Sequence, residues 1–131
     1  MWNYVIRTGI LTDGKRKITC YSGEQGKWKN NPDFVGDVGL GPIPPGNYSI
    51  GPAFVSGSSG PVTMRLTPQA GTDTHGRSGF EIHGDSISHP GAASHGCIVT
   101  TAPSGRTDRE YIDASPDKAL RVVAHPTDLV A

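Results

Sequence analysis

The sequence predicts a mostly-β domain, a β-sandwich or open barrel with one short helix, and three observations support this prediction. Short segments in which apolar and polar side chains alternate recur along the chain, which is the pattern of half-buried strands. The 18 glycines and 11 prolines fall largely at turns between these segments. Only one stretch carries a clear helix-start signal. Because no linker or internal repeat divides the chain, we expect residues 1–131 to form a single compact domain.

The N-terminal third is predicted to form three strands followed by a long loop. Large apolar side chains alternate from Trp2 to Ile6, which is the period of a strand. Asp13-Gly14 lies between two further alternating runs, and this dipeptide favours a tight hairpin turn. Residues 22–41 have few apolar anchors and predict a loop. Loops of this length in compact domains are often functional.

The rest of the chain supplies the other strands and the helix. Strands are expected at residues 47–50, 61–68, 80–83, 97–101 and 120–124. Thr107 with Glu110 three residues later fits a capping box, which predicts a helix from Thr107 through Ile112. About seven short strands and one small helix are typical of a sandwich or an open barrel.

Charge and hydropathy exclude several partners. Twelve basic and twelve acidic side chains cancel, so no strong field attracts nucleic acid or an anionic membrane. No apolar stretch approaches the roughly 20 residues of a membrane span. The first nine residues lack the basic and apolar regions of a signal peptide. We therefore expect no nucleic-acid partner, no membrane partner and no export by the general secretory route.

The two cysteines lie in different settings, which disfavours a disulfide between them. Cys20 alternates with Ile18 along one strand face and is expected to be a small core residue. Cys97 follows Gly96 at the end of a segment, residues 80–101, that holds three of the five histidines. A lone cysteine with histidines nearby is a candidate nucleophile.

The residues around Cys97 are suited to nucleophilic catalysis. Gly96 allows a sharp turn that brings backbone N–H groups close to the sulfur, where they can lower the thiol pKa and bind an oxyanion. His83 ends one predicted strand and Cys97 begins the next, so the loop between them can return the thiol to the imidazole. A buried cysteine with scattered surface histidines is an equally simple interpretation of the residue types alone.

A metal site is the alternative from another class of mechanism. The segment offers five possible zinc ligands, namely His83, Asp85, His89, His95 and Cys97. Structural zinc sites favour close paired spacings such as C-x₂-C, and the sequence has none. We therefore expect no metal and no other cofactor.

The motif "IHG" at 82–84 followed by "SHGCI" at 94–98 resembles the catalytic motif of the L,D-transpeptidase family. "YSG" at 21–23 and "GPIPPGNY" at 41–48 resemble the short branch of that family whose members are effectors of type VI secretion. The resemblance extends over most of the chain, from Trp2 to Val123. It implies an L,D-transpeptidase-like form of the predicted β fold.

The resemblance assigns roles to residues of the motif. Cys97 would be the nucleophile and His83 its base, while His95 and Ser94 would shape the site. Gly96 and Cys97 would offer oxyanion-hole N–H groups. The loop between His83 and Ser94 is short, as in the effector branch, and Val99 stands where wall-crosslinking enzymes usually carry Arg or Asn.

Substrate contacts are expected from residues around the pair. Ser94, Gly84 and Asp85 belong to the motif segment, and Asp85 could orient His83 or simply form a turn. His75 could line the cleft or be exposed. Guanidinium groups bind carboxylates bidentately, so the candidates for holding a substrate carboxylate are Arg65, Arg77, Arg106 and Arg109.

The resemblance implies a cysteine enzyme of the bacterial wall. It would cleave the L,D bond between the third residue and D-Ala of stem tetrapeptides, exchange D-Ala for other D-amino acids, or both. Its partners would be peptidoglycan stem peptides and an immunity protein that occludes the Cys97 cleft. It would reach the periplasm of target bacteria without a signal peptide, unless a leader has been removed. A zinc-dependent amidase or peptidase and a non-catalytic wall-binding module are the alternatives.

Overall fold

A closed β-barrel forms the body of the molecule in the computed structural model, which describes residues 1–129. Nine strands follow the order β4-β9-β1-β2-β3-β8-β7-β6-β5, and β4 also pairs with β6. This additional pairing closes all strands except β5 into a ring. The strands are β1 (Trp2–Val5), β2 (Ile10–Thr12), β3 (Lys17–Tyr21), β4 (Gly46–Ile50), β5 (Phe54–Ser56), β6 (Gly60–Pro68), β7 (Glu81–Gly84), β8 (Ile98–Thr100) and β9 (Ala119–Val123).

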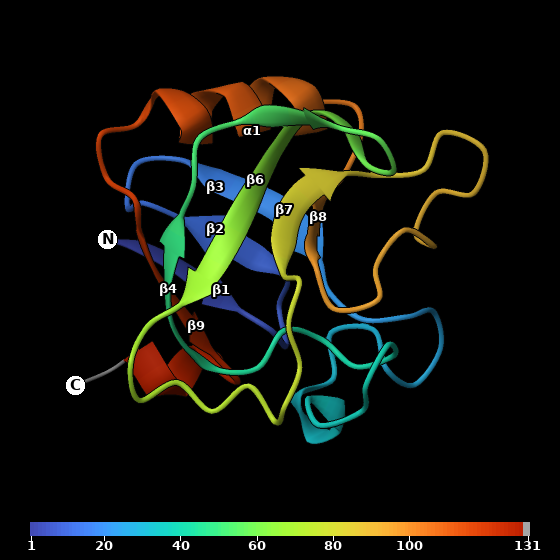
Figure 1. The fold of residues 1–131 in the computed structure, drawn as a ribbon, viewed down its shortest axis with the longest axis vertical. Coiled ribbons are helices and arrows are strands. Elements are labelled where there is room, and N and C mark those ends of the chain that lie inside the picture. The colour runs from blue at the N-terminus through green and yellow to red at the C-terminus, as the bar shows by residue number, and fades with distance from the viewer. Residues whose placement is uncertain (130–131) are drawn as a thin grey trace.

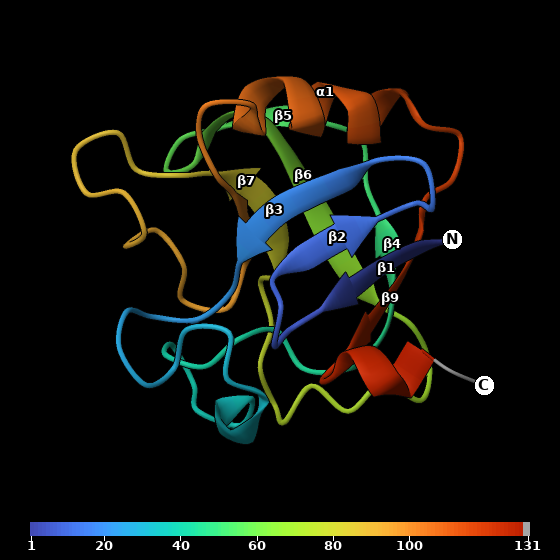
Figure 2. The same ribbon diagram turned by 180° about the vertical axis from the view of Figure 1, so that it is seen from behind.

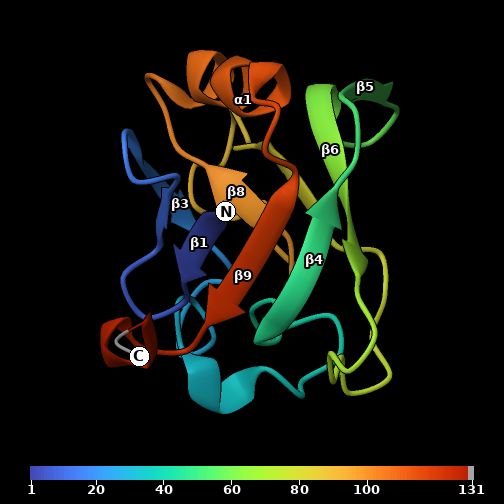
Figure 3. The same cartoon turned by 90° about the vertical axis from the view of Figure 1, so that its left-hand side faces the viewer.

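Most neighbouring strands are antiparallel, but two pairs are parallel. β1 runs parallel to β9, which lies between β1 and β4 in Figure 3. β7 runs parallel to β8. The predicted hairpin at Asp13-Gly14 joins β2 to β3, and Figure 2 shows β1, β2 and β3 side by side on one wall.

Alternating apolar side chains fill the barrel, as the sequence predicted. Trp2 and Tyr4 of β1 are fully buried, and Cys20 of β3 is 3% exposed. The core extends around the ring through Tyr48, Met64, Ile82, Ile98, Leu120 and Val122. Both cysteines are free, and Cys20 has the predicted place among the core residues.

Helix α1 (Gly105–Ala114) covers one end of the barrel, at the top of Figure 1. It packs against β6, β7 and β8, with Ile112 fully buried. Two short 3₁₀ turns complete the described structure, η1 (Pro32–Phe34) and η2 (Pro126–Leu129). In the described part of the chain, no helix is both long and apolar enough to cross a membrane.

The mostly-β prediction with one short helix is confirmed, with two local corrections. The helix begins at Gly105, so the capping box predicted at Thr107 is wrong: the Thr107 hydroxyl donates to the Ser104 carbonyl at 2.9 Å instead of capping. Strand β5 was not predicted. It is short, partly exposed and has a register shift where it pairs with β6, so its apolar alternation is weak.

Candidate active site

The parallel pair β7–β8 brings His83 and Cys97 to one face of the barrel wall. Ile82 pairs with Ile98, and both side chains are fully buried in the core. Because successive side chains on a strand point to opposite faces, His83 and Cys97, each one position away from this pair, face outward together. Both line a pocket of about 500 Å³, which we call the catalytic pocket, together with Glu81 and His95.

The surroundings of His83 leave one ring nitrogen as a base. The side chain is only 6% exposed, and its Nδ1 lies 2.8 Å from the Gly84 carbonyl oxygen. A carbonyl oxygen accepts but cannot donate, so neutral His83 carries its proton on Nδ1. The lone pair is therefore on Nε2, the nitrogen that can accept a proton in the catalytic pocket.

The Cys97 thiol is protonated at neutral pH in the resting protein. Burial raises the pKa of Cys97 to about 11, and the Glu81 carboxylate also raises it. The Glu81 backbone N–H and the Arg77 guanidinium lower the pKa but do not offset burial. The sulfur lies 3.8 Å from the Gly79 carbonyl oxygen, which can accept its proton. Attack on a carbonyl therefore requires a base to remove that proton.

Ser94 shapes the turn that carries Cys97 and does not line the catalytic pocket. It is fully buried, and its hydroxyl donates to the Cys97 carbonyl at 2.7 Å. The same oxygen accepts the Gly23 N–H at 2.9 Å and the Gly96 N–H at 3.2 Å. This last bond gives the Gly96 N–H a partner within the turn, which disfavours the role in an oxyanion hole that was expected for it.

Gly96 is required by the shape of the turn. Its φ is 133°, a conformation that residues with a side chain rarely adopt. A Cβ at this position would lie 2.5 Å from Arg77 Nη2. The residue therefore positions Cys97 through its backbone conformation.

Arg77 ties the nucleophile turn to the long loop 22–41. It is 7% exposed and lies among backbone carbonyls, so it is not placed to hold a substrate carboxylate. Its guanidinium donates to the carbonyl oxygens of Val35, Pro42, Gly41 and His95, at 2.6 to 3.3 Å. Loop 22–41 and the segment between β7 and β8 lie on the same side of the barrel, the right in Figure 1.

The "YSG" segment at 21–23 also contacts the loop between β7 and β8. The Tyr21 hydroxyl donates to Asp85 Oδ1 at 2.6 Å and accepts the Ala93 N–H at 2.9 Å. The Asp85 carboxylate also accepts the N–H groups of Ser86 and Gly91. Asp85 thus organises the loop between β7 and β8, and the turn-forming interpretation describes its contacts better than orientation of His83.

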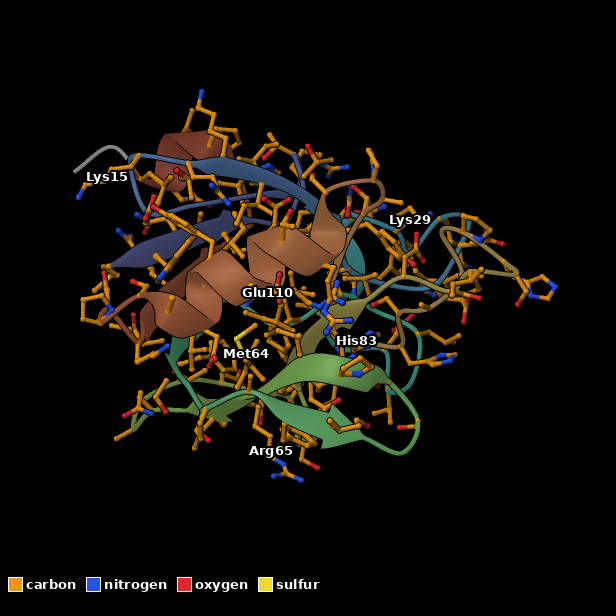
Figure 4. The ribbon with its side chains drawn as sticks, turned by 90° about the horizontal axis from the view of Figure 1, so that it is seen from above. Lys15, Lys29, Met64, Arg65, His83 and Glu110 are labelled. Atoms are coloured by element: carbon orange, nitrogen blue, oxygen red, sulfur yellow. The ribbon has the colours of Figure 1, made fainter. Side chains whose placement is uncertain are left out.

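The other predicted contact residues lie in three different places. His95 is exposed at the rim of the catalytic pocket, where its Nδ1 lies 3.2 Å from both Gly39 O and Glu24 Oε2. Arg65 lies outside this pocket, with its guanidinium over the Phe54 ring, and it points away from His83 in Figure 4. His75 is exposed near Gly36 and does not line the pocket either.

The residues proposed as zinc ligands do not converge. Across residues 1–129, no three side chains of His, Cys, Asp or Glu come together in a way that could hold a metal ion. His89 is exposed with its Nδ1 3.0 Å from the Ser88 hydroxyl, while Asp85 is bonded within its loop. The geometry groups His83 with Cys97 in one pocket and provides no metal cluster around them.

Sequence reasoning did not identify the supporting residues. Gly84 was expected among the substrate contacts, and the structure places the guanidinium of Arg109 against it, where a Cβ on Gly84 would meet that group at 2.9 Å. Arg77 and Arg109 were two of four candidate arginines, and nothing in their local sequence separates them from Arg65. Tyr21 and Ser22 carried a signal only through the "YSG" motif.

One family and one solved structure are similar to this chain. The chain matches the Tlde1 domain over residues 16–122. Its fold is similar to the crystal structure of the helical cell shape determining protein Pgp2 from Campylobacter jejuni, with a TM-score of 0.60 and 20% identity. That alignment covers 95% of this chain and 47% of the Pgp2 chain, so the chain spans about half of that structure's length. No curated protein matches the sequence. Because the Tlde1 match covers most of the sequence, this chain belongs to the Tlde1 domain family, the L,D-transpeptidase effectors of type VI secretion.

Proposed function

We propose that the protein is a peptidoglycan-modifying cysteine enzyme that acts on stem tetrapeptides. It cleaves the L,D bond between the third residue and the terminal D-Ala, or exchanges that D-Ala for another D-amino acid. One observation carries the proposal: His83 and Cys97 line the same pocket, and the Nδ1–Gly84 hydrogen bond leaves Nε2 of His83 as the base. Membership of the Tlde1 family supports the substrate class.

In the acylation half-reaction, Nε2 of His83 accepts the Cys97 thiol proton as the sulfur attacks the carbonyl carbon of the third residue. The resulting oxyanion is stabilised by a backbone N–H at the nucleophile, for which the Cys97 amide is the candidate now that the Gly96 N–H is bonded to Ser94. The C–N bond then breaks, His83 returns its proton to the leaving D-Ala amine, and a thioester remains on Cys97.

In the second half-reaction, the acceptor determines the product. Water, deprotonated by His83 as it attacks the thioester, releases a tripeptide and restores the thiol. The amine of a free D-amino acid attacks in the same way and yields an exchanged tetrapeptide. Exposed His95 lines the catalytic pocket, and we propose that both acceptors enter on its side.

The setting of the reaction is part of the same proposal. Stem peptides are found in the periplasm of target bacteria, and type VI delivery would bring the enzyme there. A cognate immunity protein would protect the producing cell by covering Cys97. The rim of the catalytic pocket, where His95 is exposed, is the surface that such an inhibitor must cover.

The test is to incubate the protein with purified muropeptides and to follow the conversion of tetrapeptide to tripeptide by mass spectrometry, with and without added D-amino acids. We expect conversion by the wild type and none by Cys97→Ala or His83→Ala. The double variant should be no worse than either single variant, because the two residues act as one unit. Substantial conversion by folded Cys97→Ala would end the proposal.

A further inference from the structure

A second cavity adjoins the catalytic pocket and has a different character. This side pocket has a volume of about 570 Å³ and shares Ser59, Gly84, Asp85 and Ser86 with the catalytic pocket. The rest of its wall comes from the start of β6, the loop between β7 and β8, and the segment from the end of β8 to the start of α1, which contributes Thr100, Gly105, Arg106 and Arg109. A substrate bound at Cys97 can therefore extend past Gly84 into the side pocket.

Arg109 lines the side pocket as a buried cation. It is 7% exposed, and its Nε and Nη1 donate to the Val62 carbonyl at 3.0 Å and the Thr100 hydroxyl at 2.7 Å. These two neutral acceptors fix the guanidinium against Gly84, whose missing side chain makes the space. Within residues 1–129, no carboxylate forms an ion pair with Arg109, and its Nη2 makes no hydrogen bond.

The charges around the side pocket leave it positive. Arg106 stands at the rim and is more than half exposed, and within residues 1–129 its one ion-pair contact is a weak one at 4.0 Å from Glu110. Asp85 is the one acidic residue of the lining, and donors of its own loop occupy its oxygens. Asp108 lies two residues after Arg106 on α1, and its carboxylate accepts hydrogen bonds from the Ser104 hydroxyl and the Arg16 guanidinium.

A buried guanidinium without a carboxylate partner is costly unless a ligand supplies the counter-charge. Burial lowers the pKa of Arg109 most and the charge of Arg106 lowers it further, while the nearby carboxylates of Glu110 and Asp108 raise it without forming an ion pair with it. Arginine remains protonated in proteins. The protein therefore maintains a fixed positive charge beside His83, in a cavity that continues from Cys97.

We propose that the side pocket binds a carboxylate of the stem peptide, with Arg109 as its main contact and Arg106 at the entrance. The inference rests on the proposed function and identifies the substrate group that the site selects. A diaminopimelate tetrapeptide has three carboxylates that Arg109 can bind. They belong to the γ-linked D-glutamate, the diaminopimelate side chain and the terminal D-Ala.

The test compares four tetrapeptides, the free acid and three in which one carboxylate at a time is an amide. Binding to the Cys97→Ala variant is measured by calorimetry, and kcat/KM is measured with active enzyme. Each is repeated with Arg109→Gln, Arg109→Lys and Arg106→Ala. Arg7→Ala is the matched control, because Arg7 is exposed and lines neither pocket. Thermal unfolding of every variant shows whether the fold is retained.

We expect that amidation of one of the three carboxylates weakens binding at least about tenfold when Arg109 is present. In the Arg109→Gln variant the same amidation should weaken binding much less. Arg106→Ala should weaken binding of all free acids by a smaller factor, and Arg7→Ala should change nothing. If Arg109→Gln does not fold, the Arg106→Ala variant and the amidated substrates still test whether the side pocket binds a carboxylate. Normal turnover with equal affinity for all four peptides would overturn the carboxylate subsite and leave the proposed function intact. Charge-selective binding without turnover would support the subsite and overturn the proposed function, while neither binding nor turnover would overturn both.

Discussion

At the scale of single residues, Cys97 combines access to a pocket with a thiol that is difficult to ionise. Its pKa of about 11 means that only a small fraction is thiolate at neutral pH. The proposed function therefore needs His83 as the base that removes the thiol proton during attack. The hydrogen bond from His83 Nδ1 to Gly84 fixes the tautomer that this role requires.

The rate of Cys97 alkylation should accordingly increase about tenfold per pH unit from pH 7 to pH 10, because the thiolate fraction increases by that factor below the pKa. The measurement is iodoacetamide modification followed by mass spectrometry, with Cys20→Ala as the control for the second thiol. His83→Ala should leave this profile unchanged while lowering turnover by two orders of magnitude or more. A plateau below pH 8 that His83→Ala removes would show a resting ion pair instead.

At the scale of elements, the nucleophile turn is held by contacts from distant segments. Ser94 bonds to Gly23, and Arg77 bonds to carbonyls of the long loop and of His95. The turn has no room for a side chain at Gly96, where a Cβ would meet the Arg77 guanidinium. The position of Cys97 thus depends on the packing of loop 22–41.

Gly96→Ala should lower kcat/KM at least about tenfold, because Arg77 or the turn must shift and displace Cys97. Gly14→Ala is a matched control: it has a similar positive φ, and its Cβ meets nothing within 4 Å. Both variants should lose about 1 kcal/mol of stability to backbone strain. Gly96→Ala should lose more because of the contact with Arg77, and only this variant should lose activity. Chemical denaturation and muropeptide turnover measure the two effects. Unchanged turnover by Gly96→Ala would show that the turn tolerates displacement.

Local sequence signals predicted some of these elements correctly and could not predict others. Alternation predicted the strands of the ring, and Asp13-Gly14 predicted its hairpin, because both signals are local. The helix start was misplaced since Thr107 resembles a cap, although its hydroxyl bonds to Ser104 within the first turn. Arg77 and Arg109 could not be assigned, because the carbonyl and hydroxyl groups that they contact come from segments far away in the sequence.

At the scale of the whole molecule, a closed apolar barrel positions a polar site on its outer face. The sequence predicted a sandwich or an open barrel, and the pairing of β4 with β6 that closes the ring has no local signature. The same core buries ionisable groups. Burial raises the pKa of Cys20 and of Tyr4 far above their ordinary values. The charge of Asp108 raises the pKa of Cys20 further, and Cys20 raises that of Tyr4.

This burial predicts that the protein loses stability in alkaline solution. A buried thiol stays protonated in the folded state but ionises above about pH 9 when the chain unfolds, so unfolding becomes more favourable as pH increases. The free energy of unfolding should fall by up to about 1.4 kcal/mol per pH unit for each such group. Urea denaturation at pH 7.5, 9 and 10 measures it. Cys20→Ala should be less stable than the wild type at pH 7.5, but its free energy of unfolding should fall less steeply as the pH increases. An equally steep fall would contradict the assignment of the alkaline loss of stability to Cys20.

The most direct measurement of the central claim is the intact mass of the protein during reaction with a stem tetrapeptide. Acid quenching at early times should trap a tripeptide thioester, seen as added mass that peptide mapping places on Cys97. Cys97→Ala should show no adduct, and His83→Ala should accumulate it far more slowly than the wild type. An adduct on Cys20, or full conversion of tetrapeptide by Cys97→Ala, would contradict the assignment of Cys97 as the nucleophile.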